Sequence, residues 1–323
     1  MTFLLIDEHN NHSYDFVPAL SRNELIVVYP PSRGGKERQW LLGIFKCLRK
    51  SRSGDAIVFV FDFQAVLAWW ICRILRIRRR FVCVNLMLDK KNTMRNRVVS
   101  AMYRKALPAG NFRSTVTSPE YGNWLNRQLG TNVGFTLLRD VFHSEYEVPA
   151  GAAESDVFCG GRNGRDWYLM AELAASMPDV SFTFVAPDSV AAKLKQCGSG
   201  NVRVYSNISE TVFLGHMASS RLVCLPLCKQ APAGLIVMFQ AAANHKPVLT
   251  SDTVTTSSYF AGGRGMILPR DAEKWRLAIK HCLDNQPEAA AMAEKMLDFC
   301  EKECSPGEFV RILDSLIDES TSV

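Results

Sequence analysis

The chain has 323 residues, of which 47% are hydrophobic and 22% charged, and its formal net charge at pH 7 is +6. This composition is typical of a soluble globular protein, and the length favours two domains over one. The longest apolar run, residues 65–72, is much shorter than the roughly 20 residues that a membrane-spanning helix needs, and the apolar start ends at Asp7 and Glu8, which argues against a signal peptide.

The first half of the sequence alternates short β-rich runs with helical patterns. The predicted strands are residues 3–6, 24–29, 56–61, 81–85, 115–117 and 135–138. The predicted helices are residues 37–49, 64–75, 95–106 and 120–129. This alternation is typical of a parallel sheet covered by helices, in which ligands bind beyond the carboxyl ends of the strands.

Residues with binding or catalytic potential follow several of these strands. Gly34 and Gly35 stand just before a helix, where they can let the backbone approach a ligand closely. Asp62 follows the third strand, where a substrate-binding carboxylate is expected, although a helix cap is an equally good interpretation. Asn85 holds the same position after the fourth strand. His143 lies near the predicted domain junction, where it can either reach a cleft or have a structural role.

The second half repeats the alternation after residues 146–155, which contain Pro, Gly and several Ala and are the predicted linker. We therefore expect one domain at residues 1–148 and another at residues 149–323. The predicted strands are residues 156–159, 181–185, 202–205, 222–225, 247–250 and 266–268. The predicted helices are residues 166–177, 189–197, 210–219, 235–244, 272–285, 289–304 and 308–317. This pattern predicts a complete doubly wound domain.

A glycine-rich turn joins the first strand of this half to its first helix. Its sequence is Gly160-Gly161-Arg162-Asn163-Gly164-Arg165-Asp166. The glycines allow the backbone to approach a diphosphate, and Arg162 and Arg165 can neutralise its charge through bidentate hydrogen bonds. A surface turn with two solvated arginines is the alternative, but the position between a strand and a helix favours the anion site. The turn is not a dinucleotide fingerprint, because the GxGxxG pattern is absent.

A second anion-binding element is predicted where a strand, a loop and a helix follow one another in residues 222–244. The helix begins at Gly234 and Leu235, so its unpaired N–H groups and its positive dipole end face the crevice at the strand ends. Lys229, in the loop before this helix, can contact a phosphate or a sugar. Tyr205, at the end of the third strand of this half, can stack on a base or pack in the core.

The stretch PAGLIVMFQAAANHKPVLTSD, residues 232–252, resembles the donor-site signature of family 4 glycosyltransferases with the GT-B fold. The GGRxxRD turn resembles the donor loop of the same family, with Arg165 in the place of a lysine. In that family, one signature glutamate contacts the donor sugar and a second holds the ribose hydroxyls. Pro232 and Gln240 occupy these two positions here. The Gln240 amide can still hydrogen-bond to a diol, whereas Pro232 has no polar side chain.

The resemblance implies an α/β protein with two Rossmann-like, doubly wound domains that face a cleft, and a last helix, residues 308–317, that packs on the amino-terminal domain. It implies a retaining, metal-independent hexosyltransferase that needs no cofactor. Such an enzyme moves a sugar from a nucleotide-diphosphate sugar, here a UDP-sugar, to a glycan or lipid-linked acceptor in bacterial polysaccharide or capsule synthesis. The catalytic candidates are Asp62, Arg165 and Lys229. The donor-binding candidates are Gly160, Gly161, Arg162, Arg165, Tyr205, Gly234, Leu235 and Gln240. The candidates that the amino-terminal domain contributes to the cleft are Gly34, Gly35, Asn85 and His143.

Two other functions share this architecture. A nucleotide-sugar 2-epimerase needs a set of catalytic carboxylates and a histidine, which we do not find in the sequence. A catalytically silent partner subunit is harder to separate from an enzyme, because both signature glutamates are replaced.

The positive charge is concentrated in the first half. Residues 1–150 hold 22 Lys and Arg against 12 Asp and Glu, a balance of +10, and the remaining 16 against 20 leave −4. Several arginines, at positions 73, 76, 78, 79 and 80, follow the apolar run 65–72. Such a surface is attracted to anionic lipid headgroups, which predicts peripheral binding to the inner face of the plasma membrane; a solvated helix face is the rival interpretation. No helix-turn-helix, RNP-like or zinc-finger pattern indicates nucleic acid as a partner.

The ten cysteines are scattered along the chain. The pairs Cys224 and Cys228, and Cys300 and Cys304, are four residues apart and therefore lack the CxxC spacing of a zinc site. We expect free, mostly buried thiols in a reducing cytoplasm, and no metal site.

Overall fold

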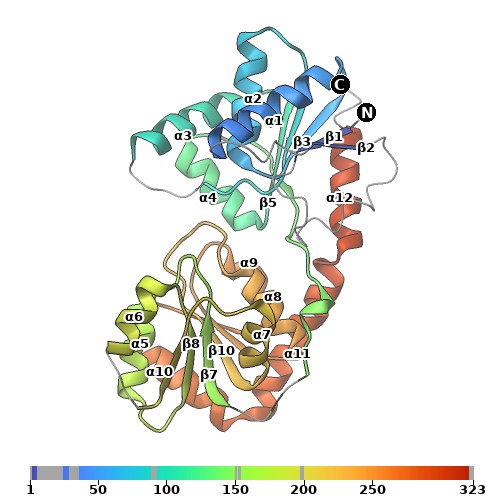
Figure 1. The fold of residues 1–323 in the computed structure, drawn as a ribbon. Helices are drawn as coiled ribbons and strands as arrows, with labels where there is room; N and C mark the ends of the chain where they lie inside the picture. The colour runs from blue at the N-terminus through green and yellow to red at the C-terminus, as the bar shows by residue number, and fades with distance from the viewer. Residues whose placement is uncertain are drawn as a thin grey trace. The chain divides into compact units, whose positions relative to one another are not determined.

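The computed structural model describes residues 2–5, 25–28, 36–88, 93–149, 151, 154–196 and 200–319. The chain divides into two compact units, each built on a parallel sheet (Figure 1). The first unit comprises residues 1–141 and 306–323, and the second comprises residues 142–305. The division therefore falls shortly before the predicted linker, residues 146–155, which lies within the second unit.

In the first unit, the described strands pair in the order β2-β1-β3-β4-β5-β6, and every pair is parallel. The strands are β1 (Thr2–Leu5), β2 (Leu25–Val28), β3 (Ala56–Phe59), β4 (Arg80–Cys83), β5 (Phe112–Val116) and β6 (Thr136–Leu137). The helices are α1 (Lys36–Lys50), α2 (Asp62–Ile74), α3 (Met94–Ala106), α4 (Pro119–Leu129) and α12 (Pro306–Glu319). All four residues of β3 are buried, as expected for a strand that is covered on both faces.

Helices cover both faces of this sheet. Successive side chains of a strand point to opposite sides, and apolar residues on each side pack against helices. On one face, Phe81 stacks beside Phe112, whose ring in turn contacts Tyr103 of α3 edge-on. On the other face, Val58 and Val82 pack against α12. The alternating pattern of β3 and β4 therefore holds two helical layers on one sheet.

Helix α12 returns from the second unit to the first. Its apolar side chains repeat at intervals of three or four residues, so they form one stripe along the helix. The buried members of this stripe are Phe309, Val310, Leu313, Leu316 and Ile317. The prediction that the last helix crosses back to the amino-terminal domain is confirmed.

In the second unit, the described strands pair in the order β12-β11-β10-β7-β8-β9, again all parallel. The strands are β7 (Ser155–Gly160), β8 (Phe182–Val185), β9 (Val202–Tyr205), β10 (Ser220–Leu225), β11 (Val248–Ser251) and β12 (Met266–Leu268). The helices are α5 (Trp167–Ser176), α6 (Asp188–Gln196), α7 (Glu210–Ala218), α8 (Leu235–Ala243), α9 (Thr256–Phe260), α10 (Ala272–Asp284) and α11 (Gln286–Glu303). Short 3-10 turns occupy Ser144–Tyr146 and Ala261–Gly263.

Two apolar cores lie on the two faces of this sheet. Leu222 and Cys224 of β10 belong to one core together with α5 and α10, whereas Val223 and Leu225 belong to the other core with α8 and α11. Helix α8 is apolar almost all round and nearly every residue of it is buried, as expected for a helix inside a domain. The prediction of an α/β protein with doubly wound domains is confirmed.

The order of the strands reverses between β7 and β10. From β7 the chain proceeds outward through β8 and β9, and from β10 it proceeds outward in the opposite direction through β11 and β12. The loops that leave β7 and β10 therefore diverge at the carboxyl edge of the sheet. In open α/β sheets, this reversal creates the crevice in which ligands bind.

One helix of the second unit was not predicted from the sequence. The structure also bears on the expectations about membrane-spanning helices and about the cysteines. Helix α9 lies between the predicted strands 247–250 and 266–268, where no helix was predicted, and Tyr259 and Phe260 anchor it in the core. In the described parts of the chain, no helix combines the length and apolar character needed to cross a bilayer. The described cysteines are free thiols, and all of them except Cys228 are buried.

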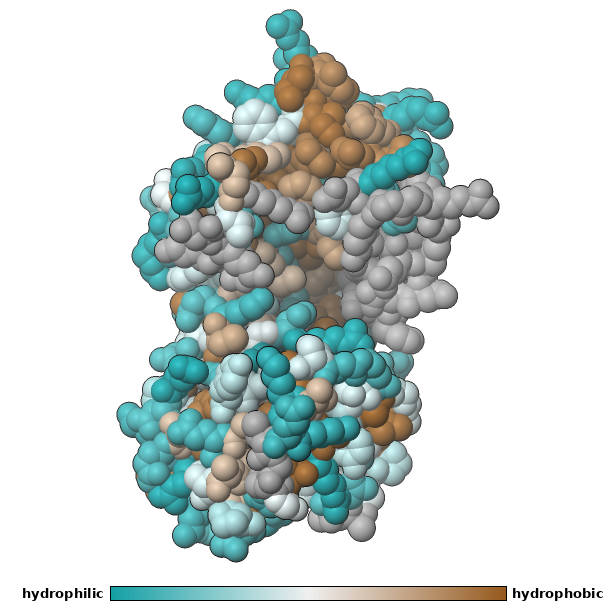
Figure 2. Space-filling model, turned by 60° about the vertical axis from the view of Figure 1, so that its left-hand side comes forward, coloured by the Kyte–Doolittle hydropathy of each residue, from teal (hydrophilic) through white to brown (hydrophobic). Residues whose placement is uncertain are grey.

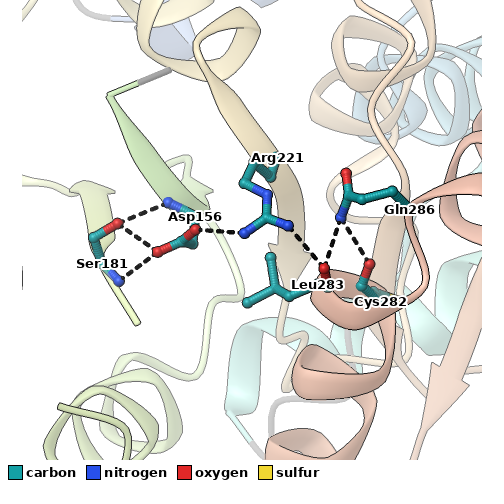
Figure 3. Close-up of polar contacts among 6 residues, drawn as sticks. All are labelled: Asp156, Ser181, Arg221, Cys282, Leu283 and Gln286. Atoms are coloured by element: carbon teal, nitrogen blue, oxygen red, sulfur yellow. Dashed lines mark hydrogen bonds and ion pairs between the residues drawn. The ribbon is translucent and has the colours of Figure 1, made fainter. Parts of the chain in front are cut away.

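A polar network fastens the amino ends of the strands in the second unit, at the edge opposite the crevice (Figure 3). Asp156 of β7 accepts hydrogen bonds from the backbone N–H and the hydroxyl of Ser181, at 2.9 and 2.7 Å, and from Arg221 Nη1 at 3.0 Å. Arg221 of β10 also donates to the carbonyl of Leu283 in α10 at 2.7 Å. Gln286 of α11 donates to the same carbonyl at 3.1 Å. Asp156 and Arg221 thus connect the starts of β7, β8 and β10 to helices α10 and α11.

Substituting Asp156 by Asn should lower the free energy of unfolding by about 1–2 kcal/mol near neutral pH, because hydrogen bonds to an ionised group are lost. Burial raises the pKa of Asp156, but the hydrogen bonds from Ser181 and Arg221 outweigh it, so the pKa is lowered in the folded state. The contribution of the ionised carboxylate is therefore complete above the pKa of the unfolded chain, about 3.9, and is lost as the pH falls through the lower folded-state pKa.

Denaturant unfolding at several pH values measures this difference. The gap between the wild type and Asp156→Asn should be constant above about pH 5 and shrink below about pH 4. The control is Glu273→Gln, which breaks an exposed pair with Arg276 within α10 and should have a much smaller effect. A gap that widens at low pH would contradict the assignment of this carboxylate.

Candidate functional site

The candidate site lies at the carboxyl ends of β7 and β10, where the strand order reverses. Two loops meet there: residues 161–166 after β7, and residues 226–234 after β10. Backbone hydrogen bonds join them, from Asp166 N to Pro226 O at 2.7 Å and from Cys228 N to Gly164 O at 2.9 Å. The site is therefore held by main-chain contacts between the loops as well as by side chains.

The first two glycines of the turn have no room for a side chain. A Cβ atom at Gly160, the last residue of β7, would lie 2.5 Å from the Phe213 ring. A Cβ atom at Gly161 would lie 2.6 Å from Arg165 Nη2, and the backbone of Gly161 has a φ of +124°, which favours glycine. The turn thus requires glycine for two separate reasons.

The Arg165 side chain folds back beneath this turn. Its Nε donates to Gly160 O at 3.0 Å, and its Nη1 donates to Asn163 O at 2.8 Å. The residue is only 8% exposed, and it forms no ion pair with any residue that the structure describes. Burial lowers its pKa. A buried guanidinium whose partners are neutral carbonyls leaves a local excess of positive charge, which favours an anion nearby.

The start of α8 lies beside this guanidinium. Gly234 precedes the helix with a φ of +81°, and a Cβ atom there would lie 3.4 Å from Arg165 Nη1. Gly234 has no side chain with which to cap this end of α8. Leu235 is buried in the core, so its contribution to the crevice is its backbone. The structure thus brings the arginine of the turn and the amino end of the small-residue helix together, where both attract negative charge.

Lys229 and Arg162 extend the positive surface in two directions. Lys229 is half-buried, and its Cδ would lie 3.4 Å from a Cβ atom placed on Gly164, so the lysine packs against the glycine turn. Arg162 is exposed and lines an adjacent pocket. Three of the predicted cations therefore belong to one turn and the loop paired with it.

The adjacent pocket has a volume of about 270 Å³. Its lining includes Gly161, Arg162, Pro187, Ile208, Glu210 and Gln240. Gln240 is 4% exposed, and its Nε2 donates to Glu210 Oε1 at 3.1 Å. Glu210 was not identified from the sequence, although its position at the start of the helix after β9 was a usable signal.

Tyr205 does not line this pocket. Its ring stacks on His216 at 4.3 Å between ring centroids, with an angle of 27° between the rings. One ring face is therefore already covered by a neighbour. Its carbonyl accepts a hydrogen bond from Ala186 N at 3.0 Å. This geometry fits the packing interpretation of Tyr205 better than the stacking of a ligand.

The candidates of the first unit lie at the carboxyl edge of its own sheet. The Asp62 carboxylate accepts hydrogen bonds from the N–H groups of Phe63 at 2.6 Å and Met87 at 3.3 Å, and burial raises its pKa. Asn85 has a φ of +49° and donates from Nδ2 to Asp140 Oδ1 at 2.6 Å. Asp62 is the first residue of α2, so it is not the helix cap of the alternative interpretation; Phe61 occupies the cap position without a side-chain hydrogen bond. The Asp62 carboxylate is instead bonded to two N–H groups at the strand ends.

Asp140 is a buried acid that the sequence pattern did not single out. Burial raises its pKa to about 6, against the opposing effect of the hydrogen bond from Asn85. Asn85 is held in turn by Thr115, whose hydroxyl donates to Asn85 Oδ1 at 3.0 Å. The side chain of Asn85 is thus committed to a network within the first unit.

Three predicted residues remain, Gly34, Gly35 and His143. Gly34 and Gly35 lie outside the described residues. His143 belongs to the second unit, where its ring contacts Tyr146 edge-on with 5.7 Å between ring centroids. His143 is therefore a residue of the second unit and not of the amino-terminal domain to which it was assigned.

Comparisons with solved structures identify the fold. Sucrose-phosphate synthase from Thermosynechococcus elongatus is similar with a TM-score of 0.77 at 12% identity, over 99% of both chains. Anabaena HepE, solved in complex with UDP-glucose, is similar with a TM-score of 0.72 at 15% identity, also over 99% of both chains. A glycosyltransferase from Rickettsia africae gives 0.65 at 11% identity, over 99% of this chain and 98% of the other. No protein-family model and no curated protein sequence matches the chain. The chain has the GT-B fold.

Substituting Gly161 by Ala tests the packing of Arg165 against the turn. The change forces a side chain into a left-handed backbone region, which costs about 1–3 kcal/mol, and it also drives Cβ against the guanidinium. Gly54→Ala is the matched control, because Gly54 has a φ of +95° but nothing within 4 Å of the point where a Cβ atom would lie. Denaturant unfolding should show a clearly larger loss for Gly161→Ala. Equal losses would mean that the guanidinium does not pack on this glycine.

Proposed function

We propose that this protein is a glycosyltransferase that moves a sugar from a nucleotide-diphosphate sugar to a glycan or lipid-linked acceptor. The observation that carries the proposal is the positive crevice of the second unit, where the buried Arg165 guanidinium lies beside the uncapped start of α8. A diphosphate is an anion that suits such a combination of a cation and the N–H groups at the start of a helix.

The structural comparisons support this donor class without identifying the donor. HepE has been solved with UDP-glucose, with UDP and glucose, and with UDP alone. At this level of identity, the similarity concerns the fold. A diphosphate donor is proposed because the site carries positive groups, and uridine is proposed by analogy with the nucleotide in the HepE structures. Bacterial polysaccharide or capsule synthesis is the proposed setting.

In the proposed reaction, the bond between the anomeric carbon and the diphosphate oxygen breaks, and a bond from that carbon to an acceptor oxygen forms. The acceptor hydroxyl loses its proton to a carboxylate base, the role that we propose below for Asp62. Negative charge builds on the departing diphosphate, and fixed positive groups lower the barrier because they are already oriented. Arg162, Arg165, Lys229 and the start of α8 are the groups proposed for this role, without a metal ion. A retaining outcome is part of the proposal.

The first unit is proposed to bind the acceptor. Asp62 follows β3 at the carboxyl edge of its sheet, the usual position of binding groups in this architecture, and Asn85 follows the neighbouring strand β4 with its side chain held by Asp140 and Thr115. Asp62 is the proposed acceptor-side carboxylate, and its raised pKa suits a group that exchanges a proton with a hydroxyl.

An anionic membrane surface is the proposed second partner of the first unit. Large apolar side chains are exposed on it, including Leu42 and Phe45 of α1 and Ile74 and Leu75 at the end of α2. Figure 2 shows an extensive hydrophobic region on the surface of this unit, at the top of the view. Exposed arginines, among them Arg73, Arg76 and Arg78, lie next to Ile74 and Leu75 in the sequence. Apolar side chains beside basic ones suit the headgroup region of an anionic bilayer.

Substituting Arg162 by Ala should weaken UDP binding about 10- to 100-fold, because a charge-assisted contact is worth about 1.5–3 kcal/mol. Calorimetric titration with UDP measures binding, and hydrolysis of a panel of UDP-sugars measures donor turnover. Arg203→Ala, which removes an exposed arginine of β9 on the same unit, is the control and should leave both unchanged. A wild type that binds no nucleotide and acts only when another chain is added would favour the silent-subunit alternative.

Flotation with vesicles tests the membrane partner. The protein should float with vesicles rich in anionic lipid at low ionic strength, and salt should weaken the association. Replacing both Arg76 and Arg78 by Gln should reduce binding by about 30-fold, since each basic residue near the surface contributes about 1 kcal/mol. Neutral vesicles provide the comparison. Absence of flotation at low salt would remove the membrane from the proposal.

A further inference from the structure

A hydrogen-bonded pair of side chains stands in the wall of the adjacent pocket of about 270 Å³. Gln240, buried in α8, donates from Nε2 to Oε1 of Glu210, the first residue of α7, at 3.1 Å. The second carboxylate oxygen, Oε2, has no hydrogen-bond partner among the described residues. One oxygen of the carboxylate is thus held by the protein, and the other is available to a ligand.

Glu210 is not used to complete its own helix. Ser209 caps α7, and its hydroxyl oxygen accepts the N–H of Val212 at 3.3 Å. The nearby acid Asp188 is engaged differently, since it accepts a hydrogen bond from Asn207. Among the described residues that line the pocket, Glu210 supplies the carboxylate and Arg162 supplies the cation.

The rest of the pocket separates polar from apolar surface. Val185, Pro187, Ile208 and Phe213 provide apolar wall, while Gly161 and Arg162 belong to the positive turn. A nucleoside diphosphate has the same division: a flat base, a ribose that carries two hydroxyls, and an anionic tail. The carboxylate is the group in this lining best suited to accept hydrogen bonds from those hydroxyls.

We propose that the Glu210 carboxylate, oriented by Gln240, accepts hydrogen bonds from the ribose hydroxyls and makes the site selective for ribonucleotides. The inference rests on the proposed function, because it concerns the same nucleotide. An ionised carboxylate has two acceptor oxygens, whereas the Gln240 amide has one and already donates to Glu210. The carboxylate expected at position 240 by resemblance is therefore supplied from α7, which lies next to α8.

This arrangement accounts for the glutamine at position 240. A glutamate there would place two carboxylates at hydrogen-bond distance, and their repulsion would destabilise the ionised pair. An amide instead donates to the single carboxylate and fixes it. The pair therefore carries one negative charge, and either of the two positions can hold it.

The proposal can be tested by moving the carboxylate from position 210 to position 240. Titration calorimetry with UDP and with 2′-deoxy-UDP measures the affinity of each protein and its preference for the ribose hydroxyl. The wild type should prefer UDP by about 10-fold, the factor that corresponds to one hydrogen bond to a charged group. Glu210→Gln should weaken UDP binding by a similar factor and bind the two nucleotides equally.

The charge-swapped protein, Glu210→Gln with Gln240→Glu, should recover the preference because the carboxylate returns from the other side of the pair. Gln240→Glu alone should bind UDP more weakly than the swap does. Glu172→Gln, which neutralises an exposed acid on α5, is the matched control and should behave as the wild type. Thermal unfolding of every variant verifies that the pocket is folded.

The outcomes separate the two proposals. A folded wild type that binds neither nucleotide overturns the proposed function, and this inference falls with it. A wild type that binds UDP, together with a Glu210→Gln variant of unchanged affinity and preference, overturns the role of Glu210 alone. Loss of the preference in Glu210→Gln and its return in the swap support the assignment.

Discussion

The candidate site depends on a cation held where water cannot easily reach it. The Arg165 guanidinium lies beneath the glycine turn, bonded to the carbonyls of Gly160 and Asn163, and no acid that the structure describes neutralises it. Removing a charge from water is costly, and neutral carbonyls repay only part of that cost. The cost is offset further when an anion binds beside the guanidinium and the start of α8. The desolvation cost that the free protein carries would then contribute to its affinity for the anion.

The glycines follow from this constraint. At Gly161, any side chain would collide with the guanidinium, and at Gly160 it would collide with Phe213 of α7. The turn therefore lies between the Arg165 guanidinium and helix α7, with no room for a side chain at either glycine. The paired loop after β10 then adds Lys229 and the amino end of α8 at the strand reversal. The fold thus gathers, at one edge of one sheet, positive groups from segments far apart in the chain.

Local patterns in the sequence were sufficient for much of this architecture. Short apolar runs separated by helical periods predicted both parallel sheets, and the order of glycines and arginines after β7 indicated an anion site. Side-chain pairings were beyond reach, because Gln240 and Glu210 are 30 residues apart and Asn85 and Asp140 are 55 apart. Such partners are chosen by packing and not by local spacing. For the same reason, burial of Arg165 could not be distinguished from solvation of a surface turn.

The position of α12 has a consequence for synthesis on the ribosome. The sheet of the first unit is synthesised early. Val58 of β3 and Val82 of β4, which α12 covers, stay uncovered until that helix has been synthesised. The second unit is continuous in sequence and is translated completely in the meantime. Its folding can therefore finish first, while an apolar face of the earlier unit still requires protection from aggregation. Only the emergence of α12 from the ribosome allows the amino-terminal unit to close.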